Sequence, residues 1–401
     1  MKHTRFDFNQ LIVLDLANNH QGNVEHGTNI IKELAKIVKK YDVKAGIKFQ
    51  FRQLKTFIHK NHQIKTNAKH IPRFLETELD RNSYEKLVKE VKQENLITIC
   101  TPFDEASVDL VVDMDFDILK IASCSSTDWP LLEKAASSGK PIICSTGGLN
   151  LSQIDDLYSF FNHQNVDFSF MHCVSIYPSK NEDLQLNQID LMKKRYPDIC
   201  VGWSTHEDQD EIAPVQIAFG KGANMFERHV GIETENIKLN AYSSTPIQIE
   251  NWIKGIIEAR KICGTSNERH EINPIEIKSL ESLQRGVYAK KNLNKGDVLK
   301  IDSIYYSMPI EIGQLPSGKF KENITIKSSI KKDKPIFESD IILPLQPDDI
   351  IIKKAIHEVK AMLSEAKIFL NSEFEVEYSH HYGIKNFRET GVVIINVINR
   401  E

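Results

Sequence analysis

The first 263 residues of this 401-residue chain alternate short apolar runs with longer amphipathic stretches. The short runs are typical of strands buried on both faces: LIVLDL (11–16), KAGIKFQ (44–50), LITICT (96–101), ILKIA (118–122), PIICS (141–145), FSFMHCV (168–174), CVGW (200–203) and NMFER (224–228). The clearest helical patterns lie at 29–41, 83–93, 130–138 and 246–262. Eight strand–helix units in about 250 residues predict an α/β fold of the (β/α)8 TIM-barrel type over residues 1–263. A doubly wound open sheet fits the same pattern, but the count of eight favours the barrel.

The remainder of the chain has a different pattern. A polar stretch, GTSNERHEINPIE (264–276), predicts a linker over 264–280. Residues 281–344 are β-rich and interrupted by turns, which predicts a small all-β domain. A C-terminal α+β extension is expected at 345–401, with a helical stretch at 353–367 and a strand-like run at 392–398. Because that run ends three residues before Glu401, we interpret the extension as the start of a further, truncated domain.

Composition excludes several classes of protein. The net charge of −4 gives no reason to expect nucleic acid or a membrane surface as a partner. No segment has the layout of a signal peptide, and no apolar run reaches membrane-spanning length. The six cysteines are scattered without a CxxC motif, which is typical of reduced cysteines. We therefore expect a cytoplasmic protein.

Two histidines follow the last two strand-like runs, His206 in WSTHED and His229 in FERHVG. A catalytic divalent metal needs neutral imidazoles on rigid supports, with coordination positions left open for substrate. Neighbouring strands of a parallel barrel would bring both side chains to the same rim. With 14 histidines in the chain, such a pair is a weak signal by itself, but its surroundings strengthen the hypothesis of a metal site.

Two lysines, Lys48 in GIKFQF and Lys120 in ILKIA, lie inside otherwise apolar strands. An unpaired buried ammonium group is costly, so each needs an anionic partner, either a carboxylate of the protein or a ligand. Their combination with hydroxyls at strand ends favours an anionic ligand such as a phosphorylated carboxylate. The other polar residues expected at this rim are Asp15, Asn18, Asn19, His20, Gln50, Thr101, Ser123, Ser145, Thr146, His172, Ser175, Tyr177, Ser204 and Arg228. For any one of these, the alternative is a polar residue bonded only to its neighbours.

At this point the chain resembles the sialic acid synthase family, which condenses phosphoenolpyruvate with an N-acetylhexosamine to make nonulosonic acids. The resemblance covers residues 10–344 and rests on the order and spacing of LDLANNHQGN, IKFQ, CTPFD, LKIASCS, PIICSTGG, MHCVSIYPS, VGWSTHE and FERHV. The segment QRGVYAKKNLNKGDVL resembles the antifreeze-like (SAF) domain that ends these synthases. In the family this domain reaches the partner's barrel in a head-to-tail dimer. The resemblance therefore implies a domain-swapped homodimer acting in the synthesis of a surface polysaccharide or glycoconjugate.

The resemblance also implies roles for individual residues. His206 and His229 would bind a divalent metal, typically manganese, with magnesium or cobalt as alternatives. Phosphoenolpyruvate would be held by Lys48, Thr101, Lys120, Ser123, Ser145, Ser175 and Ser204, with Gln50 and Tyr177 also lining the substrate site. In the implied reaction the enol carbon attacks the aldehyde of the sugar, water adds to the carbon bearing the phosphate, and phosphate leaves. Near the carbon that bears the phosphate, the family has a glutamate. Asp15 occupies that position here, and its side chain is one methylene shorter.

Three other departures fall at positions that contact the sugar in the family. A glutamate is replaced by Ser125, an aspartate by Asn240, and an arginine that recognises the N-acetyl group by Met308. Losing charged contacts to buried hydroxyls should change specificity, so we expect an acceptor other than N-acetylmannosamine. Two alternatives remain: a synthase of the Kdo-8-phosphate or DAHP type acting on a phosphorylated aldose, and a degenerate barrel that only binds sugar. The appended domain argues against the former, and the retained histidines and lysines argue against the latter.

Overall fold

The computed structural model describes residues 5–63, 68–264 and 269–342, together with His357, Ala361, Val376–Glu377 and Asn396–Val397. The chain divides into two compact units, Met1–Asn267 and Glu268–Glu401. Apart from those few positions, the helix predicted at 353–367 and the strand predicted at 392–398 lie outside the described residues, as does the interpretation of a truncated domain. No helix in the described ranges is long and apolar enough to cross a membrane.

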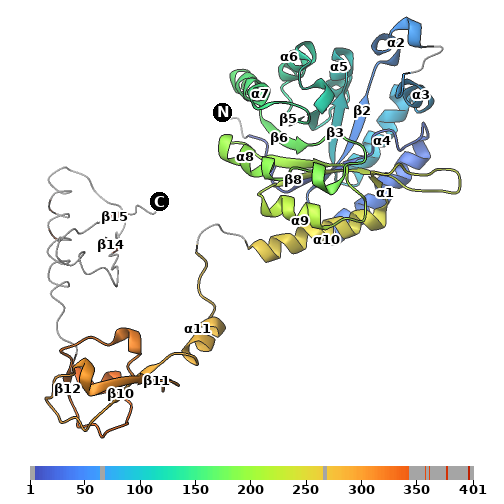
Figure 1. The fold of residues 1–401 in the computed structure, drawn as a ribbon. Coiled ribbons are helices and arrows are strands. Elements are labelled where there is room, and N and C mark those ends of the chain that lie inside the picture. The colour runs from blue at the N-terminus through green and yellow to red at the C-terminus, as the bar shows by residue number, and fades with distance from the viewer. Residues whose placement is uncertain are drawn as a thin grey trace. The chain divides into compact units, whose positions relative to one another are not determined.

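The first unit is a closed barrel of eight parallel strands (Figure 1). The strands pair in sequence order, and β1 also pairs with β8, with Asp15 opposite His229. This closure confirms the predicted TIM barrel and excludes the open sheet. Each predicted run overlaps one strand: β1 (Leu11–Asp15), β2 (Ala45–Phe51), β3 (Ile97–Pro102), β4 (Ile118–Ile121), β5 (Ile142–Ser145), β6 (Phe168–Cys173), β7 (Val201–Thr205) and β8 (Met225–Val230). A short strand, β9 (Ser243–Ser244), pairs with the end of β8.

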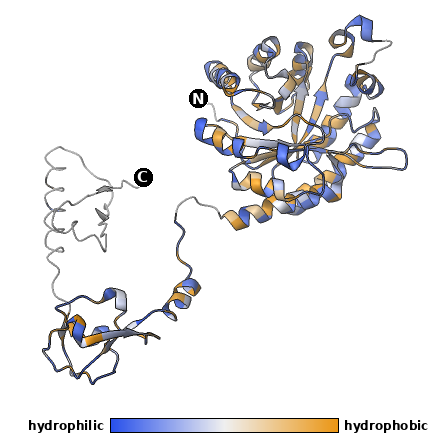
Figure 2. Ribbon diagram, in the orientation of Figure 1, coloured by the Kyte–Doolittle hydropathy of each residue, from blue (hydrophilic) through white to orange (hydrophobic). Residues whose placement is uncertain are grey.

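Helices cover the outside of the barrel: α1 (Val24–Tyr41), α4 (Arg81–Gln93), α5 (Glu105–Asp113), α6 (Trp129–Ser137), α7 (Leu151–His163), α8 (Asn187–Arg195), α9 (Ala213–Gly220) and α10 (Pro246–Cys263) (Figure 1). Along them hydrophobic and hydrophilic residues alternate, as Figure 2 shows, so that one face of each helix can pack on the strands. Local sequence fixes where helices begin. In α10, for example, Thr245 and Gln248 form a capping box and Pro246 occupies the first turn.

The connection between β2 and α4 is the longest in the first half of the barrel. It contains α2 (Leu54–Phe57), the 3-10 helix η1 (Lys60–His62) and α3 (Ile71–Glu76). Because β2 ends at the same edge as the other parallel strands, this excursion starts from the rim at which the candidate site lies.

The barrel interior changes from apolar to polar along its strands. One set of inward-facing side chains forms a separate hydrophobic cluster that includes Val13, Ile99, Ile118, Ile143, Met171 and Met225. Two residues further along the same strands, the buried side chains are Asp15, Thr101, Lys120, Ser145, Cys173 and Glu227. Since side chains two apart on a strand share a face, both sets point inward. Charge is thus concentrated at the carboxyl ends of the strands, the usual place for a TIM-barrel active site.

The second unit contains small antiparallel sheets. Strand β10 (Gly286–Ala289) pairs with β11 (Ile304–Ser307), β12 (Thr325–Ile326) with β13 (Ile341–Ile342), and β14 (Val376–Glu377) with β15 (Asn396–Val397). A small core packs under the first two pairs and includes Val287, Leu299, Ile304, Leu315 and Ile336. The segment predicted as a linker contains a helix, α11 (Pro274–Glu281), and its role as a linker stays a prediction. Asn273 caps α11 and Pro274 starts it, a local signal that the polar composition obscured.

Candidate active site

The centre of the barrel holds a buried cluster of two lysines and two carboxylates. Lys48 Nζ lies 2.9 Å from Asp15 Oδ2 and 3.2 Å from Glu227 Oε1. Lys120 Nζ lies 3.3 Å from Glu227 Oε2 and donates to Ser145 Oγ at 2.6 Å. All four charged residues are at most 4% exposed. The sequence left two possible anionic partners for each lysine, a carboxylate of the protein or a ligand. The structure shows that the protein supplies a carboxylate partner for both.

The charges in this cluster stabilise one another. Burial raises the pKa of Glu227, but Lys120 and Lys48 together bring it well below its ordinary value. Burial likewise lowers the pKa of Lys48, while Asp15 and Glu227 raise it above the usual range. Both groups are consequently ionised at neutral pH. Ser204 adds a hydrogen bond to Glu227 Oε1 at 2.9 Å.

Each lysine retains hydrogen-bonding capacity. An ammonium group has three N–H donors. Among the described residues, Lys48 has two partners, the carboxylates of Asp15 and Glu227, and Lys120 has two, Glu227 and Ser145. One donor on each lysine is therefore without a partner among the described residues.

Hydroxyl groups converge beside Lys120, around the backbone of Gly147. Gly147 N donates to Ser123 Oγ at 3.2 Å. A Cβ atom at Gly147 would lie 2.6 Å from Ser175 Oγ and 2.7 Å from Ser123 Oγ, so a side chain there would fill the space that these hydroxyls face. Thr101 Oγ1 is buried without a hydrogen-bond partner in the described part of the chain. Hydroxyls and lysines in this arrangement can bind an anion.

His206 and His229 come together at the rim above the cluster. His206 follows β7, whereas His229 lies within β8 and not after it as predicted; their ring centroids are 5.4 Å apart. His206 Nδ1 lies 3.2 Å from the Val174 carbonyl oxygen, and His229 Nδ1 lies 3.2 Å from Asp15 Oδ2. Neither Nε2 atom makes a hydrogen bond within the described part of the chain.

This pair has the properties of metal ligands. Burial, with a contribution from His229, lowers the pKa of His206 to about 3. Burial also lowers the pKa of His229, although Asp15 raises it, so both rings are neutral. Ligating histidines commonly donate their second N–H to a carboxylate or carbonyl, and here each Nδ1 atom lies 3.2 Å from such an oxygen. Two imidazoles on one ion have centroids about 5 Å apart for metal–nitrogen bonds of about 2.1 Å, close to the observed separation.

The described residues contain no group of three or more His, Cys, Asp or Glu side chains arranged to hold a metal. An ion between the two imidazoles would therefore keep several coordination positions for water and substrate, as catalytic sites do. The residues present fit such an ion, with the protein supplying two nitrogen ligands.

Two tyrosines flank the histidines. The Tyr177 ring lies 4.1 Å from the His206 ring, and the Tyr242 ring lies 5.2 Å from both His229 and Tyr177, measured between centroids. Tyr177 was predicted at this rim, whereas Tyr242, in the loop before α10, was not. No periodic pattern marks Tyr242, because it lies outside the strands.

Several residues predicted at the rim point elsewhere. His172 Nε2 contacts the Leu184 carbonyl oxygen at 2.8 Å. Arg228 pairs with Glu207 at 3.4 Å and lies over the Trp252 ring. Both occupy outward-facing strand positions, since inward residues alternate with outward ones.

Three more predicted residues make hydrogen bonds to backbone groups of the barrel. Thr146 Oγ1 donates to the Met171 carbonyl oxygen, and His20 Nδ1 accepts from Gly22 N at 3.1 Å. Asn19 Nδ2 donates to the Val230 carbonyl oxygen at 2.7 Å, at the end of β8. The backbone oxygen of the neighbouring Asn18 accepts a hydrogen bond from Arg73 Nη2.

The three positions expected to contact the acceptor differ in their surroundings. Ser125 is buried and ends the 3-10 helix η2 (Ser123–Ser125), next to a predicted site residue. Asn240 is exposed, and its Oδ1 accepts from Tyr242 N at 3.1 Å. Met308 belongs to the second unit and is 55% exposed there. Their roles stay predictions.

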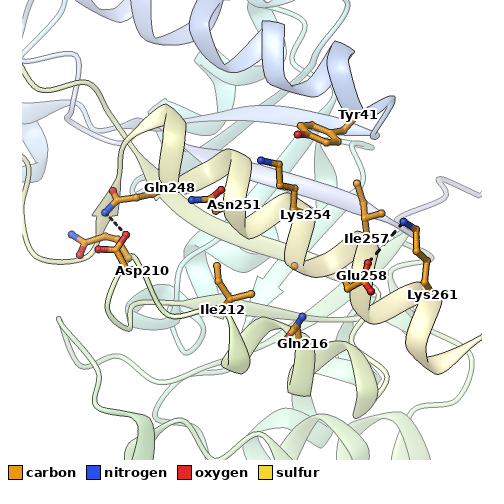
Figure 3. A pocket seen from close by; sticks show the side chains of 12 residues that line it. Tyr41, Asp210, Ile212, Gln216, Gln248, Asn251, Lys254, Ile257, Glu258 and Lys261 are labelled. Atoms are coloured by element: carbon orange, nitrogen blue, oxygen red, sulfur yellow. Dashed lines mark hydrogen bonds and ion pairs between the residues drawn. The ribbon is translucent and has the colours of Figure 1, made fainter.

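A surface cavity of about 700 Å³ lies apart from this cluster, against α10 (Figure 3). It is lined by residues that include Tyr41, Asp210, Ile212, Gln216, Lys254 and Lys261. None of the predicted site residues lines this cavity, so it is not the candidate site.

Comparison with known proteins gives consistent matches. A family model described as the NeuB family matches residues 36–268. An uncharacterized protein of Methanocaldococcus jannaschii is 31% identical over 334 residues, covering 82% of this chain and 92% of the relative. Human N-acetylneuraminate-9-phosphate synthase is 26% identical over 320 residues, covering 78% and 86%. A solved structure from Chromobacterium violaceum, assigned to spore coat polysaccharide biosynthesis, is 38% identical with a TM-score of 0.80, covering 83% of this chain and all of that one.

Proposed function

Because this chain belongs to the NeuB family of phosphoenolpyruvate-condensing nonulosonic acid synthases, we propose that it joins phosphoenolpyruvate to an aldose other than N-acetylmannosamine. The product would be a 3-deoxy-2-keto sugar acid, released together with phosphate, for a surface polysaccharide or glycoconjugate. One observation carries the proposal: the buried cluster of Lys48, Asp15, Glu227 and Lys120 lies directly below two neutral histidines with free Nε2 atoms.

Phosphoenolpyruvate is assigned to the space above the two lysines. The free N–H donor on each lysine and the hydroxyls of Ser123 and Ser175 around Gly147 support this assignment. So does the orphaned hydroxyl of Thr101, because a buried polar group without a partner is costly until a ligand satisfies it. Ser145 and Ser204 hold Lys120 and Glu227 in place.

A divalent ion, manganese with magnesium or cobalt as alternatives, is assigned to His206 and His229. When bound, it would supply Lewis-acid polarisation of the acceptor's carbonyl group. Asp15 Oδ2 lies beside His229 Nδ1 and would orient the ring, so that His229 Nε2 is the atom that would hold the ion. The ring of Tyr177 packs on His206 and restricts the direction from which an acceptor can approach.

The reaction then needs a carboxylate near the phosphate-bearing carbon. The enol carbon of phosphoenolpyruvate forms the new carbon–carbon bond with the carbonyl carbon of the acceptor, and the carbonyl oxygen takes up a proton. Water adds to the carbon that bears the phosphate and loses one proton. The hydroxyl left on that carbon loses the other as the carbon–oxygen bond to phosphate breaks, so that the 2-keto group forms and phosphate leaves. Asp15 is assigned to orient that water. Its Oδ1 accepts only from Ala17 N in the described part of the chain, at 3.0 Å, so one of its lone pairs is free.

The dimer is also a proposal. We expect residues 281–344 to act as an antifreeze-like domain that reaches the barrel of a second copy of the chain. Within the second unit, α11 and its flanks expose Ile272, Ile275, Leu280 and Leu283, each more than half exposed. An exposed apolar surface of this kind is typical of a protein interface. Light scattering on the full chain should give twice the mass of one chain.

The test of the proposed function is phosphate release from phosphoenolpyruvate with manganese and a panel of aldoses. We expect release only when an aldose is present, and a better rate with an aldose that differs from N-acetylmannosamine at the acetamido or neighbouring hydroxyl positions. Ser125 and Asn240 bring no charge to the acceptor, and that absence is the reason for this expectation. If N-acetylmannosamine were the best acceptor by a wide margin, the assignment of these positions would be wrong. No release with any aldose would contradict the proposed function.

A further inference from the structure

Arg52 follows β2 at the mouth of the barrel and continues the inward face of that strand. Lys48 and Gln50 precede it at two-residue spacing, and Arg52 Nη2 donates to Gln50 Oε1 at 2.9 Å. Gln50 Nε2 in turn lies 3.5 Å from Asp15 Oδ2. A polar contact chain therefore runs from the centre of the barrel outward to the Arg52 guanidinium.

Two aromatic rings enclose this guanidinium. Its central carbon lies 3.7 Å from the centroid of Phe103, which follows β3, and 4.1 Å from that of Phe74 in α3. Stacking between two rings fixes the plane of the group and favours its charged form. The rings hold Arg52 in place but do not use its N–H donors.

Arg52 has no carboxylate partner in the described part of the chain. Its one hydrogen bond there is to Gln50, and its Nε is buried without a partner. Burial lowers the pKa of Arg52 to about 10, which still leaves it charged at neutral pH. Lys48 and Lys120, by contrast, are each within 3.3 Å of a carboxylate. A largely buried cation with unused donors requires an anion to offset its lost hydration.

Phosphoenolpyruvate is not the anion that this position fits. The four residues from Lys48 to Arg52 correspond to about 13 Å of extended backbone, at about 3.3 Å per residue. Arg52 is therefore on the solvent side of the lysines, where the second substrate must enter. Ser125 and Asn240, the residues assigned to the acceptor, are both uncharged and would not repel an anion.

We propose that Arg52 binds an anionic group, a phosphate or a carboxylate, carried by the acceptor aldose away from its carbonyl carbon. Nε and the unused Nη positions of a guanidinium match two oxygens of either group. This inference rests on the proposed function of the same site and names the chemical class of its second substrate.

The experiment compares Arg52→Gln and Arg52→Lys with the unaltered enzyme on three matched acceptors: N-acetylmannosamine, its 6-phosphate and the corresponding uronic acid. We expect the unaltered enzyme to prefer one anionic acceptor, which identifies the group. Arg52→Gln should lower kcat/KM for that acceptor about 10- to 100-fold, the range for a hydrogen bond to a charged group. Its kcat/KM for the uncharged acceptor and its KM for phosphoenolpyruvate should stay nearly unchanged. Arg52→Lys should recover part of the loss.

A control variant and direct binding measurements distinguish a specific role of Arg52 from a general effect on the enzyme. Arg81→Gln, which alters an exposed arginine of α4 paired with Glu85, is the matched control and should change none of these constants. Calorimetric binding of N-acetylmannosamine 6-phosphate and of the uronic acid, without phosphoenolpyruvate, tests Arg52 even if turnover is absent and the proposed function fails. Phe74→Leu removes one wall but keeps the charge, and should weaken the same binding less than Arg52→Gln.

An equal loss on charged and uncharged acceptors would make Arg52 a structural residue and overturn the inference. A raised KM for phosphoenolpyruvate alone would also overturn it, by assigning Arg52 to the first substrate. So would unchanged binding of both anionic aldoses in Arg52→Gln.

Discussion

Asp15 Oδ2 lies 3.2 Å from His229 Nδ1 and 2.9 Å from Lys48 Nζ. One carboxylate oxygen thus connects a proposed metal ligand with a proposed phosphoenolpyruvate ligand. Replacing Asp15 by Asn keeps the shape of the side chain but removes the charge that orients the imidazole. We expect manganese affinity to fall about 10- to 100-fold, as for other residues that support metal ligands. Titration calorimetry on the purified chain checks this.

A control for that measurement is Asp155→Asn, which removes a surface carboxylate paired with Arg195. Its manganese affinity should equal that of the unaltered chain. If Asp15→Asn also bound manganese normally, the contact with His229 would not support metal binding.

His206→Ala should abolish turnover while the protein stays folded. His206 lies after β7, above the apolar layer of the barrel, so its removal leaves the packed interior intact. Phosphate release and a thermal melt on the same preparation measure the two effects. Retained turnover with manganese would contradict the assignment of His206 as a ligand.

Lys48→Ala and Lys120→Ala should each weaken phosphoenolpyruvate binding by about 2–5 kcal/mol, the range for truncating one partner of a buried charge pair. Both lysines have one donor left for the ligand after their carboxylate and hydroxyl contacts. Lys92→Ala, on the surface of α4, is the control. An unchanged dissociation constant in both variants would show that the lysines serve only Asp15 and Glu227.

Glu227→Gln should destabilise the barrel by about 3–5 kcal/mol, because Lys120 would lose its carboxylate partner while remaining buried. Adding Lys120→Met removes the stranded charge and should recover part of that loss. Urea denaturation measures both. Glu85→Gln breaks an exposed pair with Arg81 and should cost less than about 1 kcal/mol. A loss as small as this in Glu227→Gln would mean that the cluster contributes little to stability.

His20 makes stability depend on pH. Burial, with smaller contributions from Arg73 and His26, lowers its pKa from 6.5 to about 4. The unfolded chain therefore takes up a proton near pH 6.5, whereas the folded chain resists protonation until about pH 4. Stability from this residue is present above pH 6.5 and is lost as the pH falls toward 4. At about 1.4 kcal/mol per pKa unit, the loss is about 3 kcal/mol.

The measurement is urea denaturation at several pH values from 7 to 4 for the unaltered chain and for His20→Asn. Asparagine keeps an acceptor for Gly22 N but does not titrate, so its stability should fall less over this range. The matched substitution at an exposed position of α7, His163→Asn, is measured alongside as the control. Parallel curves for His20→Asn and the unaltered chain would contradict the prediction.

The strands of the barrel could be predicted from sequence because each is a short apolar run between polar segments. The residues inside it could be predicted only in part. Glu227 was missed although it lies two residues before His229 on the same face of β8. Arg228 and His172 were placed at the rim because they are polar and near strand ends, but counting by twos from Met225 and Met171 puts them on the outer face.

Other site residues carry no signal of this kind. Tyr242 and Phe74 come from loops and a short helix, and their contacts depend on how the connections fold over the rim. Arg52 directly follows β2 and continues its inward face, but it lies outside the apolar run KAGIKFQ (44–50) by which the sequence marks this strand. The structure draws attention to Arg52 because no carboxylate of the described residues lies next to it. The spacing of residues in the sequence cannot show that a charged side chain has no charged partner.

The apolar layer beneath the charged cluster limits how substrates can enter the barrel and how products can leave it. Val13, Ile99, Ile118, Ile143, Met171 and Met225 close the described barrel from below. A molecule seated on Lys48 and Lys120 must then enter and depart through the mouth, past Tyr177 and Arg52. Any second molecule bound near the histidines stands in that passage. From the depth of the two proposed sites we predict ordered binding, in which phosphoenolpyruvate binds before the acceptor.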